Sequence, residues 1–273
     1  MVDLNINTNL VREILTGFIR TEIQRTGYSR AVINLSGGID SAVSCVLATD
    51  ALGAENVLAL RLPYKSSSAE SLEHAQLLID QLDIPSRTIP ITDVVDPLIE
   101  RFPEMSKNRQ GNIMARVRMI AAYDQSEDFR GLVVGTSNKT EILLGYSTIF
   151  GDSACAMNPI GDLYKTQVRQ LARALDVPSV IIDKPPSADL WEGQTDEGEL
   201  GFTYDEVDRL LVLLVDQRYK PSDCIREGFS EEFVKAVISR IQKYQFKRIQ
   251  PPIAKISSRT VGSDFLYFRD WGT

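Results

Sequence analysis

Histidine is nearly absent from this sequence, and its scarcity limits the available chemistry. His74 is the single histidine among 273 residues. A serine–histidine–aspartate triad, a histidine-rich metal site or a histidine phosphocarrier would depend on this one side chain. His74 falls in a stretch of helical patterning, 69–82, and we interpret it as a histidine on a solvated helix face. The chemistry is therefore expected to rest on lysines, carboxylates and backbone amides.

Cysteine is also scarce, and long apolar runs and excess positive charge are missing. The three cysteines are widely spaced without a metal-binding pattern, which is typical of a reducing compartment. No apolar run approaches the roughly 20 residues that span a bilayer, and the N-terminus lacks the layout of a signal peptide. The net charge of -7 argues against a nucleic-acid coat. We predict a cytoplasmic protein that binds neither membrane nor nucleic acid.

Apolar runs of strand length alternate with amphipathic stretches of helix length. The expected strands are 31–35, 57–62, 86–89 and 132–134, and the expected helices are 9–26, 41–52, 69–82, 93–101 and 112–123, with Asp93 as a cap of the fourth. This alternation indicates an α/β fold, a parallel twisted sheet flanked by helices on both faces in the Rossmann-like manner. Helical additions follow at 166–175, 204–215 and 230–244. Without a repeat or a clear linker, residues 1–273 are expected to form a single domain.

Three polar turns follow expected strands, at 36–41, 63–68 and 135–141. In an open parallel sheet, ligands bind beyond the carboxyl ends of the strands. The three turns are therefore expected to face one cleft.

The first of these turns has the sequence Ser36-Gly37-Gly38-Ile39-Asp40-Ser41. Glycines before a helix let backbone N–H groups converge on an anion, yet the lysine of the common P-loop is missing. Asp40 would repel phosphates unless a cation intervened, so the combination favours Mg²⁺ between Asp40 and a polyphosphate. A tight structural turn in which Asp40 caps the next helix is the alternative.

The turn resembles the SGGxDS loop of the N-type ATP pyrophosphatases, which binds the pyrophosphate released when ATP adenylylates a substrate. Further collinear motifs over about 200 residues resemble one member family, the NAD synthetases, and so imply its adenine nucleotide alpha hydrolase-like fold. They are Leu62-Pro63-Tyr64, Gly111-Asn112 with Ala115-Arg116, Gly135-Thr136-Ser137-Asn138, Asn158-Pro159, 184–190, Asp196-Glu197, Leu200-Gly201 and Tyr204-Asp205.

The resemblance implies a role for particular residues. Asp40 and Glu141 would be Mg²⁺ ligands, and Asp40 and Lys165 would be catalytic. Deamido-NAD would contact Arg116 and Lys247. ATP would contact Asn34, Leu35, Ser36, Gly37, Gly38, Ile39, Asp40, Ser41, Arg61, Thr136, Lys165 and Ser187. Without the support of these motifs, Lys165 and Arg116 would each be interpreted as a solvated surface charge, since exposed basic residues are common.

Some positions depart from the commoner family pattern. Ile149 stands where many relatives have a dinucleotide-contacting lysine, Ala156 where they have an aspartate, and Phe246 where they have a histidine. A glutamine often found near the adenine aligns with Ser67. The ATP half of the pattern is intact, whereas the deamido-NAD contacts differ.

The implied activity is an ammonia-dependent NAD synthetase reaction, the last step of NAD biosynthesis. ATP adenylylates deamido-NAD, and ammonia then displaces AMP to form NAD. The family's glutamine-dependent members carry an additional amidohydrolase domain. No such domain fits before residue 30 and no cysteine-centred glutaminase pattern appears, so free ammonia is the expected donor; ammonia from a separate glutaminase subunit is the alternative. The resemblance also implies a homodimer, and we expect the loop 183–201 to close over the site and exclude water.

Two other functions remain open on the residues alone. One is another ATP pyrophosphatase, such as a GMP synthetase core or a tRNA-modifying enzyme, although a basic surface and a catalytic cysteine pair are not evident. The other is a nucleotide-binding module without turnover, which would not need Asp40, Glu141 and Lys165 together.

Overall fold

The computed structural model describes residues 2–191 and 193–265, and a four-stranded parallel sheet organises it. The strands are β1 (Ala31–Asn34), β2 (Val57–Arg61), β3 (Ser86–Thr88) and β4 (Leu132–Val133). Their order is β3-β2-β1-β4, with Ala31 opposite both Val57 and Leu132. Strands β2 and β3 follow on one side of β1, and β4 lies on its other side. Crevices that bind ligands form where the strand order changes direction in this way.

Each face of the sheet is covered by its own hydrophobic core, because successive strand side chains point in opposite directions. Ile33 and Ala59 lie in a core with α1 (Thr8–Arg25), α2 (Ile39–Leu52), α3 (Ala69–Leu82), α7 (Lys165–Ala174) and α8 (Ser179–Ile182). Val32 and Leu58 lie in the opposite core with α4 (Thr92–Glu100) and α5 (Lys107–Phe129). A short 3₁₀ turn, Ala54–Asn56, leads into β2.

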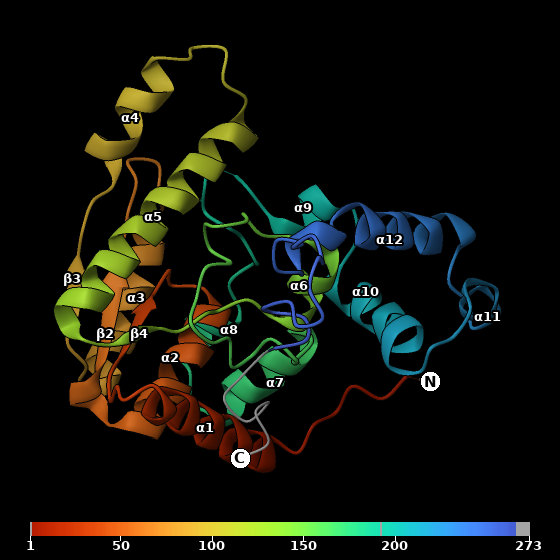
Figure 1. Ribbon diagram of the computed structural model, residues 1–273, viewed down its shortest axis with the longest axis horizontal. Helices are drawn as coiled ribbons and strands as arrows, with labels where there is room; N and C mark the ends of the chain where they lie inside the picture. Colours follow the sequence, from red (N-terminus) through yellow and green to blue (C-terminus); the bar gives the residue numbers. More distant parts are fainter. Residues whose placement is uncertain (1, 192, 266–273) are drawn as a thin grey trace.

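A third core joins the C-terminal helices, which Figure 1 shows beside the sheet domain. The helices are α6 (Lys139–Leu144), α9 (Asp196–Leu200), α10 (Tyr204–Leu211), α11 (Pro221–Arg226) and α12 (Glu231–Lys243). The 3₁₀ turn η3 (Gln245–Lys247) follows α12. Leu144, Val207 and Val234 are fully buried between them. Helix α10 continues as a π-helical turn, η2 (Val212–Asp216).

The predicted α/β class and the parallel sheet are confirmed, and several details were wrong. Helix α5 is longer than 112–123, because Ser106 caps its start and Arg130 ends it in the left-handed region. Ile91, not Asp93, is the N-cap of α4. His74 is buried, with 9% of its surface exposed, since α3 turns this side of the helix towards the protein. In the part of the chain described, no helix is both long and apolar enough to cross a membrane.

Candidate functional site

The turn between β1 and α2 has the geometry of an anion-binding loop. Gly37 has φ of +79°, and a Cβ there would lie 2.1 Å from the Ser71 carbonyl oxygen at the start of α3. Only glycine fits, because the position is left-handed and the space is filled. Gly38 is the N-cap of α2 and provides no side-chain cap, which leaves amides of the first turn available to an anion.

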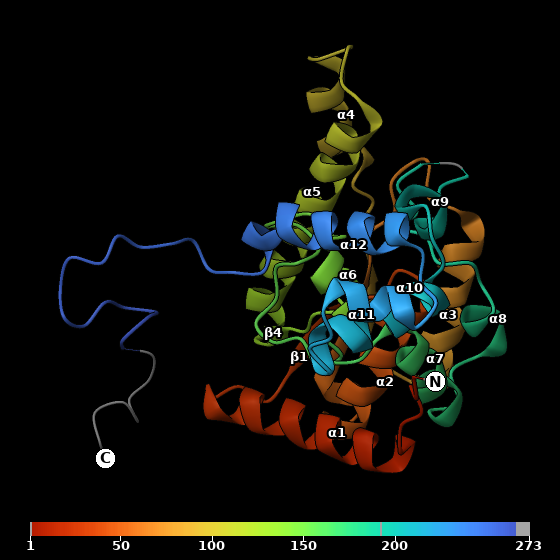
Figure 2. The same cartoon turned by 90° about the vertical axis from the view of Figure 1, so that its right-hand side faces the viewer.

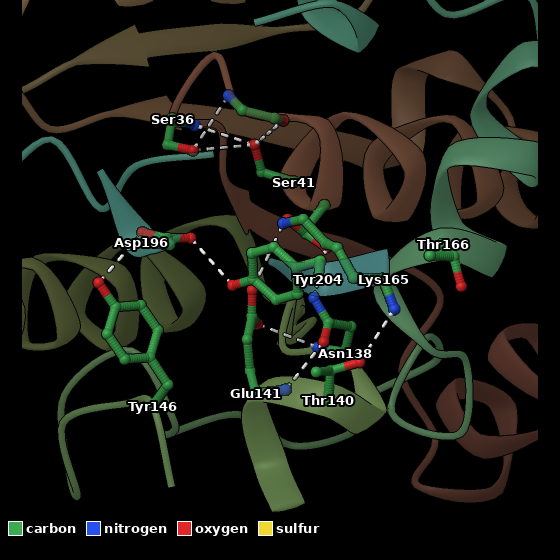
Figure 3. Close-up of polar contacts among 12 residues, drawn as sticks. Ser36, Ser41, Asn138, Thr140, Glu141, Tyr146, Lys165, Thr166, Asp196 and Tyr204 are labelled. Carbon is green, nitrogen blue, oxygen red and sulfur yellow. Dashed lines mark hydrogen bonds and ion pairs between the residues drawn. The ribbon is translucent and has the colours of Figure 1, made fainter. Parts of the chain in front are cut away.

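Hydroxyl and amide groups line the same turn. The Ser41 hydroxyl donates to the Gly38 carbonyl (2.9 Å) and lies 3.1 Å from the Ser36 hydroxyl (Figure 3). Asn34, the last residue of β1, has a buried Oδ1 without a hydrogen-bond partner. A buried acceptor of this kind usually has a partner, so this oxygen keeps an unused acceptor position beside the turn.

Next to the turn, Lys165 joins two carboxylates that lie far apart in the sequence. Its Nζ donates to Asp40 Oδ2 and lies 3.5 Å from Glu141 Oε1. Asp40 comes from the first turn of α2, Glu141 from that of α6, and Lys165 is the first residue of α7. The lysine side chain is 3% exposed, so this charge is enclosed. The structure therefore brings together the predicted metal pair and the predicted catalytic lysine.

Asn138 connects the two carboxylates of this cluster. Its Nδ2 donates to Asp40 Oδ1 (2.9 Å), its backbone N–H to Glu141 Oε2 (3.2 Å), and its Oδ1 accepts from the Glu141 N–H (2.9 Å). The last two bonds form the capping box of α6. The residue roles drawn from the sequence did not include Asn138, although an asparagine three residues before a glutamate is a sequence signal for such a box.

A third carboxylate, that of Asp196 at the start of α9, lies near the cluster. Asp196 Oδ2 accepts from the Tyr204 hydroxyl (3.0 Å) and Oδ1 from the Tyr146 hydroxyl (3.1 Å), as Figure 3 shows. The Tyr204 ring lies 5.1 Å from Lys165 Nζ. Burial raises the pKa of Asp196, and the Lys165 charge acts against that rise.

The charges of the cluster do not balance. Burial and the neighbouring Asp40 charge raise the pKa of Glu141 to about 8. Burial alone would lower the pKa of Lys165, but Asp40, Glu141 and Asp196 outweigh it and raise that pKa. Asp40 and Glu141 face a single ammonium group, and this pair of carboxylates favours an additional cation, for which carboxylate oxygens are suited if it is a hard one.

The two predicted deamido-NAD contacts lie together at a different place. Arg116, exposed on α5, donates through Nε and Nη2 to the Ile149 carbonyl (both 3.3 Å). Lys247 Nζ donates to the carbonyls of Gly145 (2.8 Å) and Ser147, and burial lowers its pKa. Both cations are therefore held by the segment that follows α6.

The other predicted ATP contacts are spread around the carboxyl edge of the sheet. Arg61 ends β2 and donates to the side chain of Gln76 on α3. Thr136 follows β4, and the Ser187 hydroxyl accepts from the Asp189 N–H (3.1 Å). Neither Arg61 nor Ser187 contacts Asp40 or Lys165. The structure therefore brings together some of the predicted ATP-binding residues and leaves others without a contact to that pair.

The loop 183–201 covers the start of α3. Lys184 Nζ donates to the Ser71 hydroxyl (2.8 Å), and Asp189 accepts from the Ser68 N–H (3.1 Å). Ser71 is also the residue against which Gly37 packs. The loop is thus connected to the anion-binding turn through one residue of α3, and α9 forms part of the loop.

A parallel sheet with a glycine turn at its carboxyl edge, and an enclosed lysine beside it, defines a nucleotide-binding protein of the α/β class. The family model described as NAD synthase matches residues 11–251. The chain belongs to the NAD synthase family.

Individual relatives agree with this assignment. The chain is 56% identical, over 98% of its length and 97% of the relative's, to a protein from Chlorobaculum parvum named NH(3)-dependent NAD(+) synthetase. It superposes on the NH3-dependent NAD synthetase from Campylobacter jejuni with a TM-score of 0.78 and 33% identity, covering 92% of this chain and 100% of that one. An NMN synthetase from Francisella tularensis gives a TM-score of 0.82 and 31% identity over the same shares.

Proposed function

We infer that the chain is an ammonia-dependent NAD synthetase, a ligase that forms a C–N bond. It converts deamido-NAD to NAD with ATP and ammonia and releases AMP and pyrophosphate. The observation that carries this conclusion is the enclosed Asp40–Lys165–Glu141 cluster beside the Ser36–Ser41 turn, in a chain more than half identical to proteins of that name.

The chemistry requires a carboxylate to be activated. A nicotinate oxygen attacks the α-phosphorus of ATP, and the bond from that phosphorus to the pyrophosphate oxygen breaks. Ammonia then attacks the acyl carbon, AMP leaves, and the nitrogen loses a proton to give the amide. We assign the departing pyrophosphate to the Ser36–Ser41 turn, and charge stabilisation at the phosphates to Lys165.

Asp40 and Glu141 would hold Mg²⁺, which supplies positive charge to the phosphates when bound. The excess of carboxylates over ammonium groups supports this assignment. No group of three histidine, cysteine or acidic side chains suited to a metal occurs in the described part of the chain. Two carboxylates together with substrate phosphates and water are the usual Mg²⁺ environment in nucleotide enzymes.

We assign deamido-NAD to the region of Arg116 and Lys247. Both carry positive charge next to the segment 145–149, which suits the phosphates of a dinucleotide. Ile149 contributes its carbonyl oxygen to Arg116, and its side chain cannot pair with a phosphate as a lysine would. The pocket therefore relies on two cations, Arg116 and Lys247.

A second copy of the chain would complete the molecule as a homodimer. Arg116, Ile120 and Tyr123 share one exposed side of α5, since they are four and three residues apart. Figure 2 shows the segment after η3 projecting away from the body, and its Ile253 and Ile256 are 62% and 95% exposed. Apolar side chains on a projecting segment are expected to be covered by a partner, here another copy.

We further propose that residues 1–273 act as one cytoplasmic domain that uses free ammonia. Helix α7 packs against both α2 and α10, which supports a single unit. The three cysteines of the chain form no disulfide bond, as expected in a reducing compartment.

The test is an assay of purified protein with ATP, Mg²⁺ and ammonium, with deamido-NAD or nicotinate mononucleotide as the acceptor. NAD and AMP in equal amounts from deamido-NAD are the expected result. Preference for the mononucleotide would place the chain with the NMN synthetase. AMP formed only with another acceptor would indicate a different ATP pyrophosphatase, and ATP binding without AMP would indicate a binding module.

A further inference from the structure

Helix α10 carries a buried carboxylate that contacts the two helices on which Glu141 and Lys165 lie. Asp208 has no solvent exposure. Its Oδ1 accepts from the Thr140 hydroxyl (2.6 Å) in the first turn of α6. Its Oδ2 accepts from the backbone N–H of Thr166 (2.8 Å) in the first turn of α7. One side chain therefore links the starts of both helices.

Thr140 continues this link to the lysine itself. The same hydroxyl that donates to Asp208 accepts from the Lys165 backbone N–H (3.0 Å). Thr140 precedes Glu141, and Thr166 follows Lys165, so the bonds fix the backbone beside each group of the cluster. Figure 3 shows the bond between Thr140 and Lys165, with Thr166 beside them.

Helix α10 also supports the lysine side chain. Tyr204 lies one turn before Asp208, and its ring lies 5.1 Å from Lys165 Nζ while its hydroxyl donates to Asp196. Removing a carboxylate from water is costly unless its oxygens are well paired. The oxygens of Asp208 are paired with Thr140 of α6 and Thr166 of α7, which are the two helices that place Glu141 and Lys165 at the site.

We propose that Asp208, acting through Thr140, is a positioning residue that sets the placement of Lys165 relative to Asp40 and Glu141. The inference rests on the proposed function, because it assigns Lys165 to the phosphates. Side chains displaced by about 1 Å can lower the rate of a positioned reaction by roughly 100-fold. The contribution is expected in kcat, since ATP would still bind through the turn and its amides.

The experiment compares Thr140→Val, Thr140→Ser and Asp208→Asn in the full-length chain. Valine keeps the shape of threonine and removes the hydroxyl, whereas serine keeps the hydroxyl. We expect Thr140→Val and Asp208→Asn to lower kcat by about 10- to 100-fold with KM for ATP within about threefold, and Thr140→Ser to restore kcat to within about threefold. Wild-type kcat per folded molecule in Thr140→Val would overturn the proposal.

Asp216→Asn provides the matched control. Asp216 also joins the starts of α6 and α7, since it accepts from Lys139 Nζ (2.9 Å) and the Tyr164 hydroxyl (3.0 Å), but it does so through side chains only. It should lower Tm and leave kcat unchanged; an equal loss of kcat there would reduce Asp208 to a structural role and overturn the proposal. Wild-type protein that forms no NAD would instead refute the proposed function. In that case the rate of ATP-dependent pyrophosphate release, compared between the wild type and the same variants, still tests whether Asp208 and Thr140 position Lys165.

Discussion

Asp40 and Lys165 are 125 positions apart in the chain and form an ion pair that is almost closed to solvent. The pair exists because α2 and α7 pack side by side in one core, each beginning at the carboxyl edge of the sheet. Asn138 and Glu141 complete the arrangement from α6, so three helix starts converge on one point. Helix starts are favourable places for anions, and Lys165 offsets only part of the negative charge of the converging carboxylates.

Removing the Asp40 carboxylate tests the proposed Mg²⁺ role. Asp40→Ala should lower ATP-dependent pyrophosphate release by at least about 100-fold, because the phosphates lose their cation and Lys165 loses its partner. Asp50→Asn, on the same helix and paired with Arg12 at the surface, is the control and should retain activity. Circular dichroism checks that both variants fold. Near-normal turnover of Asp40→Ala would remove the metal assignment.

Asn138→Ala separates the cap of α6 from its contact with Asp40. We expect the free energy of unfolding to fall by about 1 kcal/mol, as for a lost N-cap, and kcat to fall as well. Ser230→Ala removes an N-cap of similar type from α12, where Ser230 accepts from the Phe233 N–H. It should lower stability to a similar extent without changing kcat. Denaturant unfolding and steady-state kinetics measure the two effects; equal kcat in both variants would contradict the bridging role.

Gly37→Ala should disable the anion-binding turn. The new Cβ would meet the Ser71 carbonyl at 2.1 Å in a left-handed residue, so we expect a loss of stability on the order of 3 kcal/mol and weakened ATP binding. Gly27 also has positive φ, +83°, but a Cβ there meets nothing within 4 Å. Gly27→Ala should cost only about 1–2 kcal/mol. Calorimetry of ATP binding and thermal unfolding distinguish the two variants, and similar behaviour would show that the Ser71 contact is unimportant.

Limited proteolysis tests whether the loop 183–201 closes over the site. ATP with Mg²⁺ should slow cleavage within the loop, because Lys184 and Asp189 already anchor it beside the turn. Lys184→Ala should weaken that protection, whereas Lys235→Ala, on the surface of α12, should not. Equal cleavage of the wild-type loop with and without ATP would contradict closure.

Residue patterns were sufficient to predict much of the fold. The alternation of apolar strands with helices predicted four parallel strands, and α3 agrees with its expected range, 69–82. Periodicity does not say how deeply a helix is packed, which is why His74 was wrongly placed on a solvated face. The length of α5 was underestimated because its polar first turns carry little apolar periodicity.

The sequence by itself determined the chemistry at the start of α2, since two glycines, two serines and an aspartate suit an anion and a cation at any strand-to-helix turn. Only the tertiary structure decided that Lys165 lies opposite Asp40, that Asn138 donates to Asp40, and that Tyr204 lies beside the lysine. It also decided that Asp208 bonds Thr140 and Thr166 next to the cluster. Such contacts join segments that are dozens of residues apart, and they form only when packing of the three cores brings the helix starts together. Local sequence encodes local geometry, whereas the pairing of distant side chains is a property of the packed chain.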